Sequence, residues 1–168
     1  MAFICLMAAS LSAQTQKGSM MIGGTAGFSS SKAGDETTME IVFAPMVGYF
    51  VIDQLAIGGG FSVGLLTAKE FNTTVLGIDP TVRYYFNGSG STRLFGQAAF
   101  RYASVKVENF DAQTGTGFGI GTGINYFLND HVALEAILGY NSFKAKNADD
   151  ATGTFGLQFG VSAFVGGK

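Results

Sequence analysis

The feature that most constrains the fold is an alternation of period two that recurs from Ser19 to the end of the chain. Between Leu55 and Leu65, large apolar side chains alternate with Ala, Gly and Ser, and three later segments repeat this pattern. A period of two places alternate side chains on opposite faces of a β-strand, whereas a helix requires 3.6. The sequence therefore predicts an all-β fold whose strands have one bulky apolar face and one small or polar face.

The pattern divides into eight predicted strands, with ends defined to within a few residues. They span residues 19–29, 39–51, 55–66, 74–86, 93–106, 114–128, 132–144 and 152–165. Each is near or above the roughly 9–11 residues that a tilted strand needs to cross a bilayer. Predicted connections at 52–54, 87–92 and 129–131 are tight, and those at 30–38, 67–73, 107–113 and 145–151 are longer. Short turns at one end and longer loops at the other are typical of an antiparallel up-and-down transmembrane β-barrel.

Composition decides which face is expected to meet lipid. Charged residues make up 13% of the 168 residues, about half the usual share of roughly 25%. No apolar stretch approaches the roughly 20 residues of a membrane-spanning helix. The chain contains 25 glycines, and the small face is mostly Gly, Ala, Ser and Thr with few charges, so it would make a poor solvated surface but suits a narrow barrel interior. We therefore expect the bulky face to point outward into lipid, with a soluble lipocalin-like ligand-binding barrel as the less favoured alternative.

The amino terminus predicts an export signal. Residues 1–13 form an apolar run that ends in small residues, with a cleavage site expected after Ala13. This divides the chain into a signal peptide, residues 1–13, and a barrel domain, residues 14–168. No Lys or Arg precedes Lys17, so the start of the signal peptide is left open, and a buried first strand or helix is the alternative. The single cysteine, Cys5, lies in this segment, so the mature chain is expected to have no thiol.

The predicted register turns the charged side chains within strands toward the interior. These are Glu40, Asp79, Arg83, Arg101 and Glu135, accompanied by the polar residues Gln97, Asn125 and Gln158. An unpaired charge in a dry interior is expensive, so we expect one connected network. The expected contacts pair Arg83 with Asp79 and Arg101 with Glu135. A structural polar plug is the favoured interpretation, and an ion path or gate is the alternative.

An aromatic motif recurs at the ends of predicted strands. The form Tyr-Phe-x-x-Asp-x-apolar-Ala-apolar occurs at residues 49–57 and again at 126–134, and residues 84–87 repeat its first half between them. Amphipathic rings favour the membrane interface, so we predict an aromatic girdle at the periplasmic side. Its members are Tyr49, Tyr84, Phe86 and Tyr126. General enrichment of aromatic residues in strands is the alternative.

Several function classes find no support in the sequence. The net charge of −2 provides no basic face for a nucleic acid. The only histidine, His131, falls in a predicted turn, and Asp53 and Asp130 occupy matching turn positions where Asx capping accounts for them. We therefore expect no enzyme activity and predict no catalytic residue, metal site or cofactor.

Three segments resemble the small outer-membrane barrel family, the OmpA- and OmpX-like porin-fold proteins. They are Ser-Leu-Ser-Ala-Gln at 10–14, residues 48–58, which are similar to segments of Bacteroidetes-type barrels, and the aromatic last strand. The resemblance implies a bacterial outer-membrane location, a lipid bilayer as partner and insertion by the barrel assembly machinery. The family usually ends on an aromatic residue, whereas here residues 166–168 follow Phe164 and Val165.

Family members serve as envelope anchors, adhesins or resistance factors, and a few are enzymes. We therefore expect a non-enzymatic barrel that stabilises the cell envelope or presents loops to an unspecified extracellular partner. A narrow channel for ions or small solutes is the alternative. The sequence does not decide between these roles.

Overall fold

A computed structural model describes residues 13–33, 36–67, 72–86 and 91–166, with the backbone alone for residues 13, 29–33 and 36–38. The described residues form a short 3-10 helix, η1 (Ala13–Thr15), and eight strands. The strands are β1 (Met20–Ala33), β2 (Glu36–Ile52), β3 (Leu55–Thr67), β4 (Asn72–Tyr85), β5 (Thr92–Val107), β6 (Gln113–Phe127), β7 (Val132–Ala145) and β8 (Thr152–Val165). Residues 1–12 of the expected signal peptide lie outside this description.

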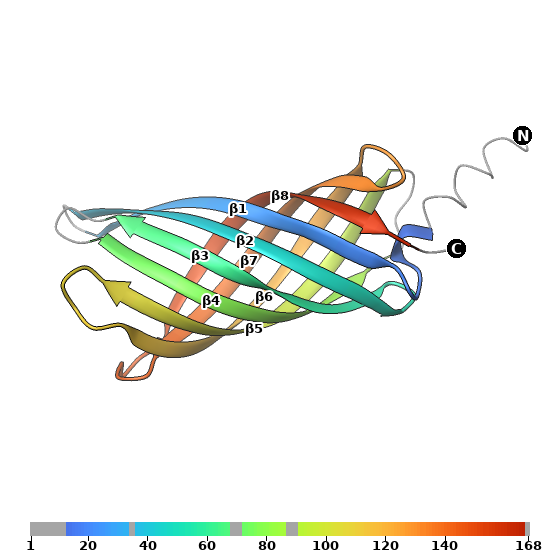
Figure 1. Cartoon of the computed structure of the whole chain (residues 1–168). Helices are drawn as coiled ribbons and strands as arrows, with labels where there is room; N and C mark the ends of the chain where they lie inside the picture. The colour runs from blue at the N-terminus through green and yellow to red at the C-terminus, as the bar shows by residue number, and fades with distance from the viewer. Residues whose placement is uncertain (1–12, 34–35, 68–71, 87–90, 167–168) are drawn as a thin grey trace, which may run out of the picture.

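Each strand pairs with its neighbour in sequence, and β1 pairs with β8 to close the barrel. Every pairing is antiparallel, and Met20 lies opposite Val165 at the closing seam. Figure 1 shows the strands tilted around one long axis, with β1 beginning where β8 ends. We call this the terminal end of the barrel and the other the distal end. The predicted eight-stranded antiparallel up-and-down fold is confirmed.

The strands are 13–17 residues long, and the first two run further than expected. Backbone pairing of β1 with β2 continues to Ala33 and Glu36, through most of the segment predicted as a loop at 30–38. Where a strand extends beyond the bilayer, its outward side chains need not be apolar. The polar sequence of residues 30–38 is therefore compatible with paired strands as well as with a loop. Distal connections at 34–35, 68–71, 108–112 and 146–151 are scarcely longer than terminal ones at 53–54, 86–91 and 128–131. The expected contrast between short turns and long loops is therefore weak.

The bulky face points outward, as predicted. Side chains such as Ile57, Phe61 and Leu157 are exposed on the outside, whereas Ala56, Ser62 and Ser162 on the alternate positions are buried. Across the central part of the strands the outer wall is apolar except at Thr122 of β6, whose hydroxyl donates to the Phe95 carbonyl at 3.0 Å. No helix among the described residues is long and apolar enough to cross a membrane.

Glycines on the inner face differ in the space around them. A Cβ at Gly58 would collide with the backbone of Val47 and Gly48 on the neighbouring strand, so only glycine fits there. A Cβ at Gly156 would meet nothing within 4 Å. Any side chain is therefore blocked at Gly58 by the neighbouring strand, whereas the space beside Gly156 is open to a Cβ.

Candidate functional site in the barrel lumen

The terminal half of the lumen is filled by an aromatic plug to which every strand contributes at least one buried side chain. Its members, from β1 to β8, are Met21, Phe50, Ala56, Tyr85, Phe95, Phe127, Ala133 with Ile137, and Phe164. Ring centroids lie 5.7 Å apart for Phe50 and Tyr85, 5.4 Å for Tyr85 and Phe95, and 5.1 Å for Phe127 and Phe164. Tilted ring pairs at these distances are favourable packing geometries. The plug thus spans the whole cross-section of the barrel.

The segment before β1 lies against the terminal end of the barrel. The Gly18 amide donates to the Phe50 carbonyl at 2.9 Å, and the Gln54 amide donates to the Thr15 carbonyl at 2.7 Å. The Lys17 amide donates to the Asp53 carboxylate at 2.8 Å. Gln14 and Thr15 are buried. Residues 14–19 are therefore hydrogen-bonded to the β2–β3 turn and bury part of themselves at this end.

Directly above the plug, Arg83 of β4 forms an ion pair with Glu135 of β7. The guanidinium Nη1 lies 2.5 Å from Glu135 Oε2, and Nη2 lies 3.3 Å from Oε1, which makes the pair bidentate. Both side chains are 1% exposed. The pair spans the lumen, because β4 and β7 are not neighbours in the sheet.

Arg83 is held on all sides by further partners. Its Nη2 and Nε donate to Gln97 Oε1 at 2.6 and 3.1 Å, and the Tyr85 hydroxyl lies 3.3 Å from Nη1. Its guanidinium carbon lies 4.0 Å from the centroid of the Phe95 ring, a cation–π contact. Glu135 also accepts from the Ser162 hydroxyl at 3.3 Å. Arg83 and Glu135 therefore form a fully desolvated polar layer, continuous with the aromatic plug.

A second ion pair lies further toward the distal end. Arg101 Nε donates to Asp79 Oδ1 at 2.5 Å, and the two side chains are 28% and 13% exposed. Asp79 lies between the ladder pairs that join Ile78 to Tyr102 and Thr81 to Ala99, so it faces Arg101 on the adjacent strand. Among the described residues the charges thus form two pairs, and the expected partners, Arg83 with Asp79 and Arg101 with Glu135, are wrong. Partner choice follows the cross-strand register, which alternation within a strand does not specify.

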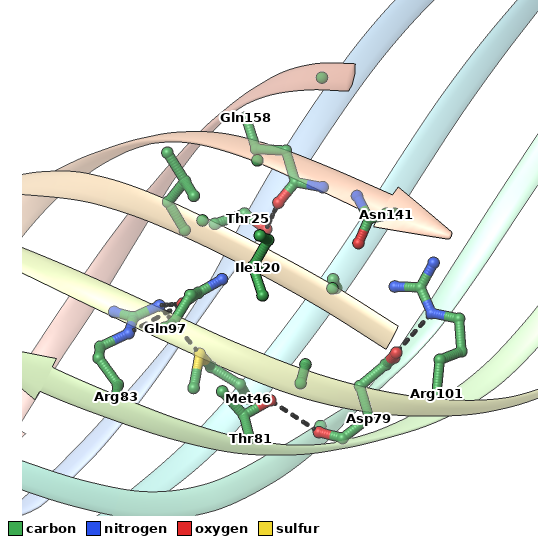
Figure 2. Close-up of a pocket in the computed structure, with 18 of the residues that line it drawn as sticks. Thr25, Met46, Asp79, Thr81, Arg83, Gln97, Arg101, Ile120, Asn141 and Gln158 are labelled. Carbon is green, nitrogen blue, oxygen red and sulfur yellow. Dashed lines mark hydrogen bonds and ion pairs between the residues drawn. The ribbon is translucent and has the colours of Figure 1, made fainter. Parts of the chain in front are cut away.

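Two connected hollows occupy the rest of the lumen. The first, of about 90 Å³, lies between the two arginines, as Figure 2 shows, and is lined by Thr25, Met46 and Gln97 among others. The second, of about 340 Å³, shares Arg101, Asn141 and Gln158 with the first and is lined by apolar side chains such as Val75 and Phe143. Arg83 borders only the first. The described lumen is therefore a cup, hollow at the distal end and filled from Arg83 to the terminal end.

The other lumenal residues predicted from the sequence occupy different levels. Glu40 lines the distal hollow, and Gln158 accepts a hydrogen bond from the Thr25 hydroxyl at 3.2 Å. Asn125 is completely buried between its ladder neighbours Arg93 and Glu135, and its side-chain amide has no hydrogen-bond partner in the described protein. Arg93, which the sequence analysis did not place inside, is also inward-facing and buried at the start of β5.

The four residues of the predicted girdle all lie on the outside at the terminal end. Tyr49, Tyr84, Phe86 and Tyr126 are exposed, and Tyr84 packs edge-on against Phe86 with centroids 5.4 Å apart. The residue after each tyrosine, namely Phe50, Tyr85 and Phe127, turns inward and belongs to the plug. Outward rings also gather toward the distal end, where Tyr140 packs against Phe155 at 4.8 Å and near Phe118 at 6.5 Å. A girdle at the membrane interface stays a prediction, and the sequence pattern predicted neither the plug nor the distal rings.

The turns carry no catalytic arrangement in the described residues. His131 Nδ1 lies 3.2 Å from the Phe164 carbonyl, a backbone group at the terminal end. Asn129, and not Asp130 as expected, caps its turn by accepting from the amides of His131 and Val132 at 2.8 and 2.9 Å. Over the described ranges, no three His, Cys, Asp or Glu side chains gather where they could share a metal ion.

Comparison with known proteins agrees with this architecture. A family model described as "Outer membrane protein beta-barrel domain" matches residues 1–162. No curated protein sequence matches the chain. The crystal structure of Neisserial surface protein A superimposes with a TM-score of 0.71 at 16% identity, covering 88% of this chain and 99% of that one.

Two Pseudomonas aeruginosa structures are also similar. The outer membrane protein OprG gives a TM-score of 0.59 at 14% identity, covering 90% of this chain and 98% of its own. The N-terminal β-barrel domain of OprF gives 0.58 at 15% identity, covering 89% and 98%. At these identities the three structures establish the fold alone.

Proposed function

The chain belongs to the family of outer-membrane β-barrel domains and lies in the bacterial outer membrane, and on this premise we propose that it is a non-conducting barrel with a structural role in the envelope. The observation that carries this proposal is the double seal in the lumen, formed by the aromatic plug and the Arg83–Glu135 pair. An ion crossing the barrel would have to displace the packed side chains of the plug and a desolvated ion pair. Such a lumen is a packed interior and not a pore.

The orientation of the barrel follows from how such proteins are inserted. A chain delivered from the periplasm and folded into an even number of strands leaves both termini on the periplasmic side. The terminal end, with its Tyr49 and Tyr126 girdle, then faces the periplasm, and the hollow distal end faces outward. We expect the barrel assembly machinery to perform the insertion, because the last strand ends with the aromatic residue Phe164 followed by Val165.

The geometry of the connections bears on the alternative roles. The two distal connections that the structure describes, at 108–112 and 146–151, are five and six residues long and offer little area to an adhesion partner. A structural role is therefore better supported than loop presentation.

The geometry of the turn at His131 supports a non-enzymatic protein, since the ring faces a backbone carbonyl in place of a serine or carboxylate.

Planar-bilayer recording tests this proposal against the narrow channel. The folded wild-type protein should give no steady conductance, whereas a variant that opens both seals should conduct. This variant combines Phe50→Ala, Tyr85→Ala and Phe164→Ala with Arg83→Ala and Glu135→Ala, so it removes the large rings from the centre of the plug and the ion pair above them. Phe159→Ala, on the outer face of β8, is the matched control and should stay silent. Heat-dependent gel mobility confirms that each variant is folded. Steady ohmic conductance of the wild type would reject the sealed barrel and favour a channel.

A further inference from the structure

Lysines cluster on one side of the distal end. Of the four lysines whose side chains the structure describes, Lys106 and Lys144 lie at the distal ends of β5 and β7, Lys146 is the first residue after β7, and only Lys17 lies elsewhere. All three are exposed. No carboxylate among the described residues forms an ion pair with them, since the salt bridges there involve arginines. The outer wall therefore carries a local cationic surface.

The strand register arranges this surface into rows. Thr116 of β6 lies opposite Tyr102 of β5 on one side and opposite Lys144 of β7 on the other. In the next row toward the distal end, Thr114 lies opposite Ser104, and the Lys146 amide donates to the Thr114 carbonyl at 2.8 Å. Small residues on β6 thus leave a trough between the long side chains of β5 and β7.

This trough is a hollow of about 280 Å³ on the outside of the barrel. Its lining combines two ammonium groups, a phenol and two hydroxyls, and includes no carboxylate among the described residues. The lining residues are Tyr102, Thr114, Gly115, Thr116, Lys144, Ala145 and Lys146. Lys144 donates one hydrogen bond, to the Asp149 carbonyl at 2.9 Å, and an ammonium group has two more protons to donate.

Nearby acids lie in the loops and not in the hollow. Glu108 accepts from the Asn72 side chain on β4, and Asp111 lines a separate hollow with Phe110 and Gln113. Asp149 and Asp150 belong to the β7–β8 connection, where the backbone carbonyl of Asp149 receives Lys144. Lys144 and Lys146 therefore line a hollow that none of these four acids lines.

The hollow continues into the lipid-facing wall. Phe118 follows Thr116 on the same outer face of β6, and Phe100 precedes Tyr102 on β5. A molecule in this position would find cations and hydroxyls at its polar end and aromatic rings along its apolar end. Basic and aromatic side chains at the interfacial level are suited to an anionic lipid.

We propose that the Tyr102–Thr116–Lys144–Lys146 hollow binds the phosphorylated headgroup of an outer-leaflet lipid, whose acyl chains lie on the wall beneath. The inference rests on the proposed orientation, which places the distal end in the outer leaflet. The ammonium groups of Lys144 and Lys146 hold the phosphate, and the three hydroxyls donate to its remaining oxygens. Binding should weaken as salt rises, because the site is exposed.

Native mass spectrometry of the folded full-length protein with diphosphoryl lipid A measures this binding directly. We expect the double variant Lys144→Gln, Lys146→Gln to lose affinity about 30-fold, the effect of removing two charges near a membrane surface. Lys17→Gln, at the terminal end, is the matched control and should bind as the wild type does. The same lipid without its phosphates should bind the wild type as weakly as the double variant binds the phosphorylated form.

Two outcomes would overturn the proposal. Equal affinity of the double variant and the wild type would show that the lysines do not hold the headgroup. Complete displacement of the lipid by inorganic phosphate would show a phosphate site without a role for the acyl chains. Neither outcome bears on conductance, so failure here is distinguishable from failure of the sealed-barrel proposal.

Discussion

The Arg83–Glu135 pair allows a quantitative test of the sealed interior. Replacing Glu135 by Leu leaves the Arg83 guanidinium buried without its counter-ion, and replacing Arg83 by Met leaves the Glu135 carboxylate in the same state. Breaking a buried pair on one side destabilises a protein by about 3–5 kcal/mol. Arg83→Met also removes the donors of two hydrogen bonds to Gln97, at about 1 kcal/mol each.

The double variant Arg83→Met, Glu135→Leu has no stranded charge and places two apolar side chains beside an apolar plug. Its loss should therefore be well below the sum of the two single losses, with a coupling free energy of at least about 3 kcal/mol. The hydrogen bonds to Gln97 are lost in Arg83→Met alone and also in the double variant. Their contribution therefore cancels in the coupling free energy.

The assay is urea unfolding in lipid vesicles, followed by circular dichroism and heat-dependent gel mobility, since the chain has no tryptophan. The Arg101–Asp79 pair is the internal control. It is 28% and 13% exposed, so the same cycle there should give a coupling of about 1 kcal/mol or less. A coupling below about 1 kcal/mol for Arg83–Glu135 as well would mean that water reaches that layer, and the reasoning for a seal would fail.

Three further perturbations test separate parts of the structure. Leu157→Arg, on the outer face of β8, should destabilise the folded barrel by about 2–4 kcal/mol in urea titrations if it lies near the bilayer midplane, and tolerance of this change would contradict the lipid-facing assignment. Gly58→Ala should prevent folding, as scored by gel mobility, because of its collision with the β2 backbone, whereas Gly156→Ala should fold normally; equal behaviour of the two variants would argue against the register. Asn125→Leu should leave stability unchanged or raise it, because the buried amide has no protein partner to lose, and a loss above about 1 kcal/mol would show that the amide is satisfied in another way.

The parts of this structure that depend on local alternation could be predicted from the sequence. A period of two within each strand is enough to assign Ile57 to the outer face and Arg83 to the lumen, because successive residues point to opposite faces. The same rule, applied to the doublets Tyr49-Phe50 and Tyr126-Phe127, would also have revealed the plug. The first ring of each doublet faces outward and the second faces the lumen, whereas only the first rings were given a place in the predicted girdle and Phe50 and Phe127 were left unassigned.

Contacts between strands could not be predicted in this way. Arg83 meets Glu135 across the lumen, and Arg101 meets Asp79 on the adjacent strand, because turn geometry and strand stagger set the register. The inward position of Arg93 was missed, although it has the same parity as Arg101 on the same strand. The open space beside Gly156 could not be predicted from the sequence either, since a cavity depends on side chains from several strands at the same level along the barrel axis.

The central claim is that the lumen is a cup sealed below Arg83, and thiol accessibility tests it most directly. Gly156 and Ser162 lie on the same face of β8, the first beside both lumenal hollows and the second buried against Glu135. In a Cys5→Ser background, Gly156→Cys and Ser162→Cys variants in intact proteoliposomes are exposed to a membrane-impermeant thiol reagent. The account predicts rapid labelling of Gly156→Cys and no labelling of Ser162→Cys until the barrel is unfolded. Comparable labelling of both positions in the folded protein would contradict it.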